Sequence, residues 1–105
     1  MNLTEYQCVI LIHLKESKSI NRISAKTVSE LLDILKIVNE KDVHGYNKNL
    51  LDKLLDLDLV SLGLPDGRSR TYYITPNGVK FLNTLSADTI DSVMERYKKG
   101  KLTNA

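Results

Sequence analysis

The chain has 105 residues and a formal net charge of +2; 42% of its residues are hydrophobic, 27% are charged, and one is a cysteine. This length fits one folded domain with a single core, and the composition excludes a disordered chain. The single cysteine excludes an internal disulfide, no segment approaches the roughly 20 apolar residues that span a bilayer, and the N-terminal residues lack the basic start of a secretory signal. We therefore expect a cytoplasmic protein with no membrane contact.

Two helices are predicted in the first third of the chain. Residues 4–7, Thr-Glu-Tyr-Gln, have the spacing of a capping box, and the apolar residues that follow predict a helix to about Ser17. Ser24 is predicted to cap a second helix, in which apolar residues repeat at helical spacing from Val28 to Leu35. Residues 20–23 between the two helices are predicted to be a short connector.

A third helix and a hairpin are predicted next. The third helix begins at about Val43, after a turn over residues 36–41, and carries apolar residues at helical spacing to Leu55. Residues 63–78 read GLPDGRSRTYYITPNG, in which Pro65-Asp66-Gly67 predicts a turn and the residues from Thr71 onward are strand formers.

The last part of the chain predicts two further helices. Thr75 is a cap followed by proline at the first helical position, and the apolar residues after it predict a short fourth helix. Ser86 caps a last helix that runs to about Lys99, and residues 100–105 are expected to form a disordered tail. The sequence thus predicts one mainly α-helical domain over residues 1–99, with a small β-hairpin.

Positive charge is concentrated in the second part of the chain. Residues 1–60 carry eight basic and nine acidic residues, a net charge of −1, whereas residues 61–105 carry seven basic and four acidic residues, a net charge of +3. Basic charge gathered in one region is typical of a protein that binds phosphate groups, although a surface charge of this size is also common without such a role.

The order of elements resembles the winged helix-turn-helix domains of bacterial DNA-binding proteins. The stretches that carry the resemblance are residues 27–32 as the supporting helix, residues 47–55 as the second helix of the unit, Asp58-Leu59-Val60 as the step into the wing, and residues 72–78, Tyr-Tyr-Ile-Thr-Pro-Asn-Gly. The last of these is similar to the signature that closes the wing in PadR-like and MarR-like regulators. The resemblance covers residues 4–85 and implies a three-helix core, a wing and a C-terminal helix, with double-stranded DNA as the partner.

Two groups of residues are candidates for contacts with DNA. At the hairpin tip, arginine and hydroxyl side chains suit phosphate oxygens or a narrow minor groove; these are Arg68, Ser69, Arg70 and Thr71. Around the start of the third helix, polar side chains suit base edges in the major groove; these are Lys41, His44, Asn47 and Lys48. The alternatives are a solubilising turn and a solvated helix face with Lys-Asp pairs. Asp52, Asp56 and Asp58 would repel phosphate along the later half of the helix, so the wing is expected to be the main contact.

Apolar stripes on the first and last helices resemble the dimer-forming elements of these regulators. The residues predicted to form a homodimer interface are Tyr6, Ile10, Ile90, Val93, Met94 and Tyr97. Packing of the last helix on its own domain and use of its basic end on DNA are the alternatives.

Neither catalysis nor a cofactor is expected. The sequence has no glycine-rich phosphate loop and no nucleophile or zinc-protease motif, and a metal site at His13 or His44 is not expected because we find no Cys, Asp or Glu at metal-ligand spacing from either. The predicted function is therefore DNA binding by a small transcriptional regulator. Two alternatives remain open: an accessory factor for plasmid or phage DNA processing, at a transfer origin or in replication or partition, with a protein partner in the same nucleoprotein complex, and a winged-helix protein-interaction module.

Overall fold

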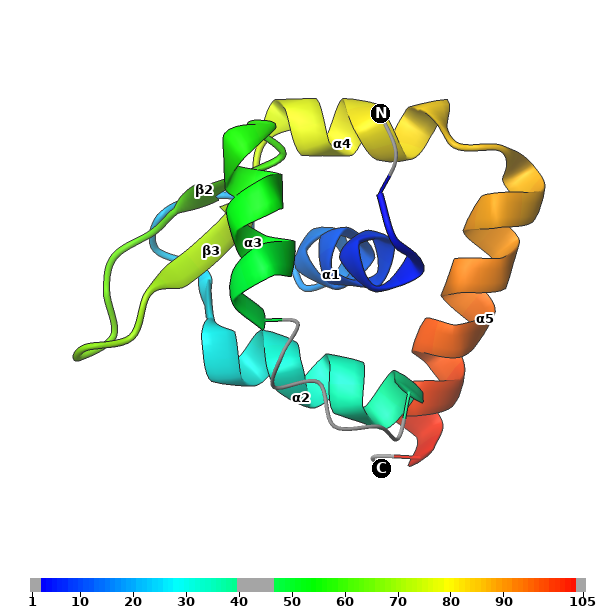
Figure 1. Ribbon diagram of the computed structural model, residues 1–105, viewed down its shortest axis with the longest axis horizontal. Helices are drawn as coiled ribbons and strands as arrows, with labels where there is room; N and C mark the ends of the chain where they lie inside the picture. The colour runs from blue at the N-terminus through cyan, green and yellow to red at the C-terminus, as the bar shows by residue number, and fades with distance from the viewer. Residues whose placement is uncertain (1–2, 40–46, 104–105) are drawn as a thin grey trace.

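The computed structural model describes residues 3–39 and 47–103, with only the backbone described at residues 32, 35–39, 47–49 and 96–103. Helix α1 (Glu5–Glu16) lies at the centre and is seen nearly end-on in Figure 1, with the other helices around it. These are α2 (Val28–Asn39), α3 (Asn47–Asp56), α4 (Pro76–Thr84) and α5 (Ala87–Thr103). The strands are β1 (Lys26–Thr27), β2 (Val60–Leu62) and β3 (Thr71–Ile74), which form an antiparallel sheet in the order β1-β3-β2.

Helix α1 is central because it is apolar on all sides. Its residues from Gln7 to Ile12 are all buried, and so is Leu14. A helix that is hydrophobic all round requires neighbours all round, which α2, α3, α4, α5 and β3 supply. The predicted capping box is confirmed: the Thr4 amide donates to Gln7 Oε1 (2.8 Å), and the Gln7 amide donates to Thr4 Oγ1 (3.2 Å).

Strand β1 was not predicted. Lys26 and Thr27 pair with Tyr72 and Thr71 of β3, which places a third strand directly before α2. The predicted helix cap at Ser24 is wrong, since α2 begins at Val28 and Thr27 exchanges hydrogen bonds with Glu30, as in a capping box.

Helix α3 turns into the wing through a left-handed residue. Asp58 has a φ of 58°, and the Asp58 and Leu59 amides donate to the carbonyl oxygens of Leu55 and Leu54 (both 3.0 Å). This arrangement is a Schellman motif, in which glycine is the usual left-handed residue and aspartate is tolerated. The first described residue of α3 is Asn47, and the predicted start near Val43 lies outside the described residues.

Helix α4 is fixed to the same corner of the fold. The predicted cap is confirmed: Thr75 Oγ1 accepts from the Gly78 amide (3.1 Å) and donates to the Asp58 carbonyl (2.5 Å). The Thr75 amide donates to the Leu59 carbonyl (3.1 Å). The end of α3, the start of the wing and the start of α4 are therefore one connected unit.

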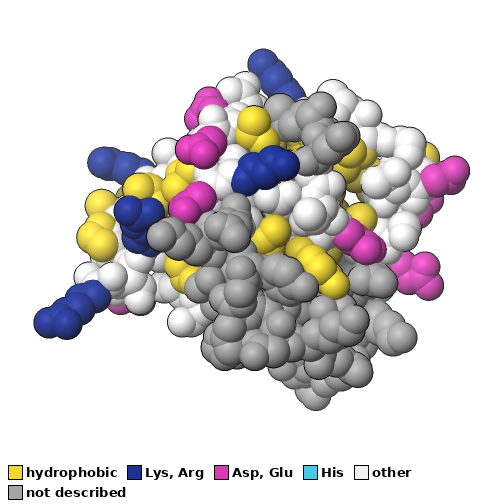
Figure 2. All heavy atoms as spheres, viewed as in Figure 1, with side chains coloured by type: hydrophobic (Ala, Val, Ile, Leu, Met, Phe, Trp, Pro, Cys, Tyr) yellow, Lys and Arg dark blue, Asp and Glu magenta, His cyan; other side chains and the backbone are white. Residues whose placement is uncertain are grey.

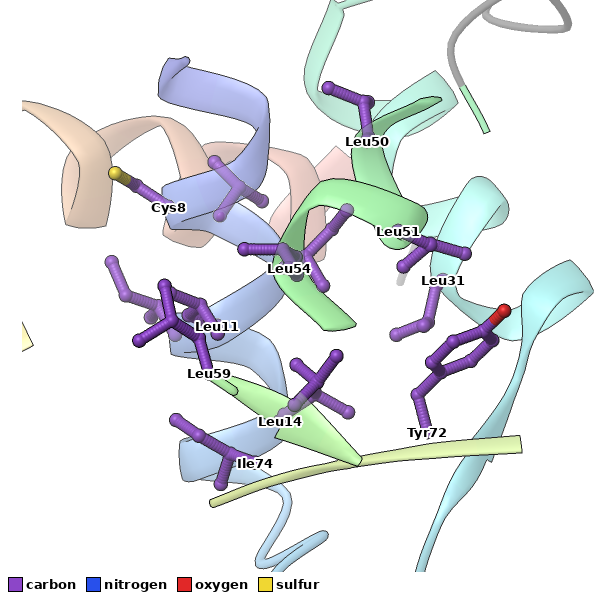
Figure 3. Close-up of a cluster of buried hydrophobic side chains, with 14 of the residues drawn as sticks. Cys8, Leu11, Leu14, Leu31, Leu50, Leu51, Leu54, Leu59, Tyr72 and Ile74 are labelled. Atoms are coloured by element: carbon purple, nitrogen blue, oxygen red, sulfur yellow. The ribbon is translucent and has the colours of Figure 1, made fainter. Parts of the chain in front are cut away.

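Helix α5 packs on its own chain, against α2 and α1. It continues beyond the predicted end at Lys99, so the chain is helical to Thr103 where a disordered tail was predicted. The core at the meeting point of these elements is mainly leucine and isoleucine from α1, α2, α3 and the sheet, and Tyr72 of β3 points into it (Figure 3).

Cys8 belongs to this core. Its side chain is buried, and burial, with a smaller contribution from the charge of Glu5, raises the pKa of the thiol. The thiol is therefore the neutral form at pH 7 and acts as a small apolar side chain. Among the described residues, no helix has the length and apolar character to cross a membrane.

Candidate nucleic-acid interface

The β2-β3 hairpin forms a wing that projects from the body of the protein (Figure 1). Its tip is a tight turn, in which Asp66 and Ser69 exchange both backbone hydrogen bonds (3.1 and 3.0 Å). Gly67 has a φ of 61° and Arg68 has no positive φ, which is the pattern of a type II′ turn with glycine at its first central position. The turn thus spans residues 66–69 and is centred on Gly67-Arg68, whereas the prediction placed it earlier, at Pro65-Asp66-Gly67.

The wing carries a bulge below this turn. Between the pairs Leu62-Tyr72 and Asp66-Ser69, residues 63–65 oppose residues 70–71, so one strand has an extra residue. Thr71 lies beside the bulge, is 4% exposed, and donates its hydroxyl to the Leu64 carbonyl (2.6 Å). This corrects the prediction for Thr71, whose hydroxyl holds the wing together and is not available to a phosphate.

The other three predicted wing contacts are all on the surface. Arg68, Ser69 and Arg70 are exposed, and the turn and bulge fix the backbone that carries them. Figure 2 shows basic side chains at the hairpin end of the molecule, one of them at its far tip. The arrangement presents positive charge on a projecting hairpin, which suits an anionic partner.

The predicted contacts near α3 are less fully described. Lys41 and His44 lie outside the described residues, and Asn47 and Lys48 open α3 with their side chains undescribed. The buried face of α3 is anchored by leucines; these are Leu50, Leu51 and Leu54. The first turn of the helix is also tied to α1, because Gln7 Nε2 donates to the Leu50 carbonyl (3.3 Å).

The later half of α3 carries the acidic side chains that were expected there. Asp56 is exposed and Asp52 is half-buried, so carboxylates do follow the later turns of the helix. Asp58 is exposed as well, and its Oδ2 accepts a hydrogen bond from Asn77 Nδ2 (2.7 Å). That carboxylate joins the end of α3 to the start of α4.

Two basic residues near the wing were missed in the sequence. Arg22 is exposed, and its carbonyl accepts a hydrogen bond from the Leu64 amide of the wing (3.1 Å). Lys26, which is half-buried, pairs with Tyr72 through β1. Both residues come close to the wing only through contacts with residues far along the chain, and a strand of two residues leaves no periodic signal.

The predicted dimer residues divide into two groups. Ile10 is 1% exposed and Val93 is 3% exposed, so both belong to the core of the single chain and offer no surface to a second copy. This corrects the prediction for these two residues. Tyr6, Ile90 and Met94 are half-buried, and the side chain of Tyr97 lies outside the described part of the structure.

A metal centre finds no support in the described residues, among which no group of three or more His, Cys, Asp or Glu side chains is placed to hold an ion. The described surface therefore offers a basic wing and a helix start, and no reactive cluster. Binding of a large anionic partner is the chemistry that such a surface suits best.

In a comparison with known proteins, no family model matches the chain. The chain is 33% identical over 85 residues to the DNA-binding protein TubR of Clostridium botulinum C phage, across 81% of this chain and 96% of that protein. A solved structure of RosR from H. salinarum is 24% identical, with a TM-score of 0.62 and coverage of 97% of this chain and 96% of that one. The predicted fold is thus confirmed as a winged helix-turn-helix, and the narrower PadR-like or MarR-like placement stays a prediction.

Proposed function

The chain belongs to the family of the DNA-binding protein TubR, and from this premise we propose that it binds double-stranded DNA in the cytoplasm, without enzymatic activity. The observation that carries the proposal is the wing tip, where Arg68, Ser69 and Arg70 are exposed on a backbone fixed by the turn. Guanidinium groups there can donate to phosphate oxygens or enter a narrow minor groove.

The proposed binding mode uses the wing and the start of α3 together. Asn47 and Lys48, with Lys41 and His44 before them, are proposed to face the major groove, where such side chains read base edges. The exposed carboxylate of Asp56 disfavours phosphate near the later turns of α3. We therefore assign most of the electrostatic attraction to the wing and the sequence readout to the first turn of α3.

The biological outcome proposed first is transcriptional regulation, by analogy with other stand-alone domains of this fold. A second candidate is an accessory role in phage or plasmid DNA processing, such as replication, partition or transfer, and it is favoured by the phage source of the TubR relative. The two are separated by selecting bound fragments from the source genome. Fragments at a promoter support regulation, and fragments at an origin or a partition site support DNA processing.

The proposal predicts binding to duplex DNA that weakens as salt is added. Each phosphate neutralised by a basic side chain contributes about −0.9 to the slope of log Kobs against log salt concentration. Fluorescence anisotropy of a labelled mixed-sequence duplex, titrated with the protein at several salt concentrations, measures this slope. If the protein does not bind the duplex, or binds it with an affinity that salt does not change, the proposed DNA binding is contradicted. A winged-helix protein-interaction module would then be the remaining hypothesis.

A homodimer is part of the proposal, through the half-buried Tyr6, Ile90 and Met94, together with Tyr97. Replacement of Ile90 by aspartate is expected to shift the protein toward monomer, because the charge would lie in an apolar contact. Sedimentation velocity over a concentration series measures the shift. A wild-type protein that stays monomeric at the highest concentration, with and without duplex, contradicts this part of the proposal.

A further inference from the structure

Four large apolar side chains are exposed at the base of the wing. Ile20 is 58% exposed, Ile23 86%, Leu62 42% and Leu64 53%. A single exposed aliphatic side chain is common on protein surfaces, whereas several in one region indicate a contact surface. We call these four residues the wing-base patch.

The wing-base patch sits on a fixed backbone. In the loop after α1, Asn21 Oδ1 accepts from the Ile23 and Ser24 amides (both 2.9 Å), and Ser24 Oγ accepts from the Ile20 amide (3.1 Å). These bonds form a closed turn that fixes the backbone of the loop that carries both exposed isoleucines.

The same turn is joined to the wing. The Arg22 carbonyl accepts from the Leu64 amide (3.1 Å), and a Cβ on Gly63 would lie 2.3 Å from Ala25 Cβ, so only glycine allows this approach. The loop at residues 20–24 therefore lies against the base of the wing, at Gly63 and Leu64.

The exposed arginines of the loop and the wing indicate which kind of partner could cover the patch. Arg22 on the loop and Arg68 and Arg70 on the wing are exposed, and Figure 2 shows hydrophobic and basic side chains interleaved at the hairpin end of the molecule. Two copies meeting face to face here would bring these arginines together, which is unfavourable. A polyanion with apolar surfaces between its charges fits better, and duplex DNA has this chemistry in the sugar edges that line its grooves.

We propose that the loop at residues 20–24 is a second DNA-contacting element beside the wing. Arg22 donates to a backbone phosphate, and Ile23, with the rest of the wing-base patch, packs against the sugar edges of the groove that the wing enters. This inference rests on the proposed function and adds to it an apolar contact that salt does not screen.

Two substitutions separate the charged contact from the apolar one. Arg22→Gln is expected to reduce affinity and to make the salt slope shallower by about 0.9, the value for one lost phosphate contact. Ile23→Ala is expected to weaken binding about fivefold at every salt concentration with the slope unchanged, because the lost term is apolar. Both side chains are exposed, so thermal unfolding midpoints equal to wild type are expected.

The experiment is the salt series on the labelled mixed-sequence duplex, with Lys80→Gln as the matched control, since Lys80 is an exposed lysine on α4. If Arg68→Gln weakens binding while Arg22→Gln and Ile23→Ala match Lys80→Gln, the inference is overturned and the proposed function stands; the patch would then suit a protein partner. If the wild type shows no salt-dependent binding to duplex, the proposed function and the inference both fail. An Ile23→Ala loss that changes with salt also contradicts the apolar contact.

Discussion

Reversal of both wing charges, by Arg68→Glu with Arg70→Glu, is expected to reduce affinity for duplex DNA by at least about 30-fold at low salt. The estimate takes about 1 to 3 kcal/mol for each arginine that contacts DNA. The salt slope should become shallower by about 1.8, since two phosphate contacts are lost. The hairpin should remain folded, because both side chains are exposed and the tip is held by the backbone bonds between Asp66 and Ser69. Fluorescence anisotropy over a salt series measures both quantities.

The control must separate a local contact from a general change of net charge. Lys15→Glu with Lys80→Glu changes the net charge by the same amount at two exposed lysines on α1 and α4, away from the wing. We expect this control to lower affinity only a few-fold, as a long-range effect that salt screens. An equal loss in the two double variants would show that net charge, rather than the wing, attracts the DNA.

Gly78→Ala is expected to destabilise the fold by about 3 kcal/mol, the upper end of the usual range for an overpacked buried site. A Cβ at this position would lie 2.3 Å from the Leu59 carbonyl oxygen and 2.6 Å from Ile74 Cγ1. The carbonyl has little freedom to move, because it accepts from the Thr75 amide and follows the Schellman motif of α3. Urea unfolding followed by circular dichroism measures the loss.

Gly67→Ala is the matched control for this prediction. Gly67 has nothing within 4 Å of the added Cβ, but its φ of 61° is unfavourable for alanine. The expected cost is about 1 kcal/mol, from backbone strain alone. An unfolding midpoint for Gly78→Ala at or above that of Gly67→Ala would contradict the close contact between α4 and Leu59.

The parts of the fold that the sequence predicts are those set by neighbouring residues. Thr4 and Gln7 cap α1, and Thr75 caps α4 before Pro76, because each cap needs only residues within one turn. The wing signature at residues 72–78 also has a physical basis here. Its threonine holds the Asp58 carbonyl and its glycine allows α4 to approach Leu59, so the stretch fixes the corner between α3 and α4.

The predictions that the structure contradicts depend on contacts between residues far apart in the sequence. Strand β1 exists because it pairs with β3, and Arg22 lies beside the wing because of a bond to Leu64. An apolar stripe shows that a helix face will be covered, but not by which chain. Ile10 and Val93 were therefore predicted for a dimer and are instead covered by their own domain. The turn at the wing tip was predicted too early in the chain because the bulge at residues 63–65 leaves no mark in the sequence pattern.

The proposed binding mode assigns more of the DNA affinity to the wing than to the start of α3. The most direct test compares two alanine pairs on one duplex at one salt concentration: Arg68→Ala with Arg70→Ala, and Asn47→Ala with Lys48→Ala. We predict that the wing pair loses more affinity, because Asp52 and Asp56 lower the positive potential of α3 whereas the wing carries two exposed arginines. A larger loss from the helix pair, or no loss from the wing pair, would contradict the claim.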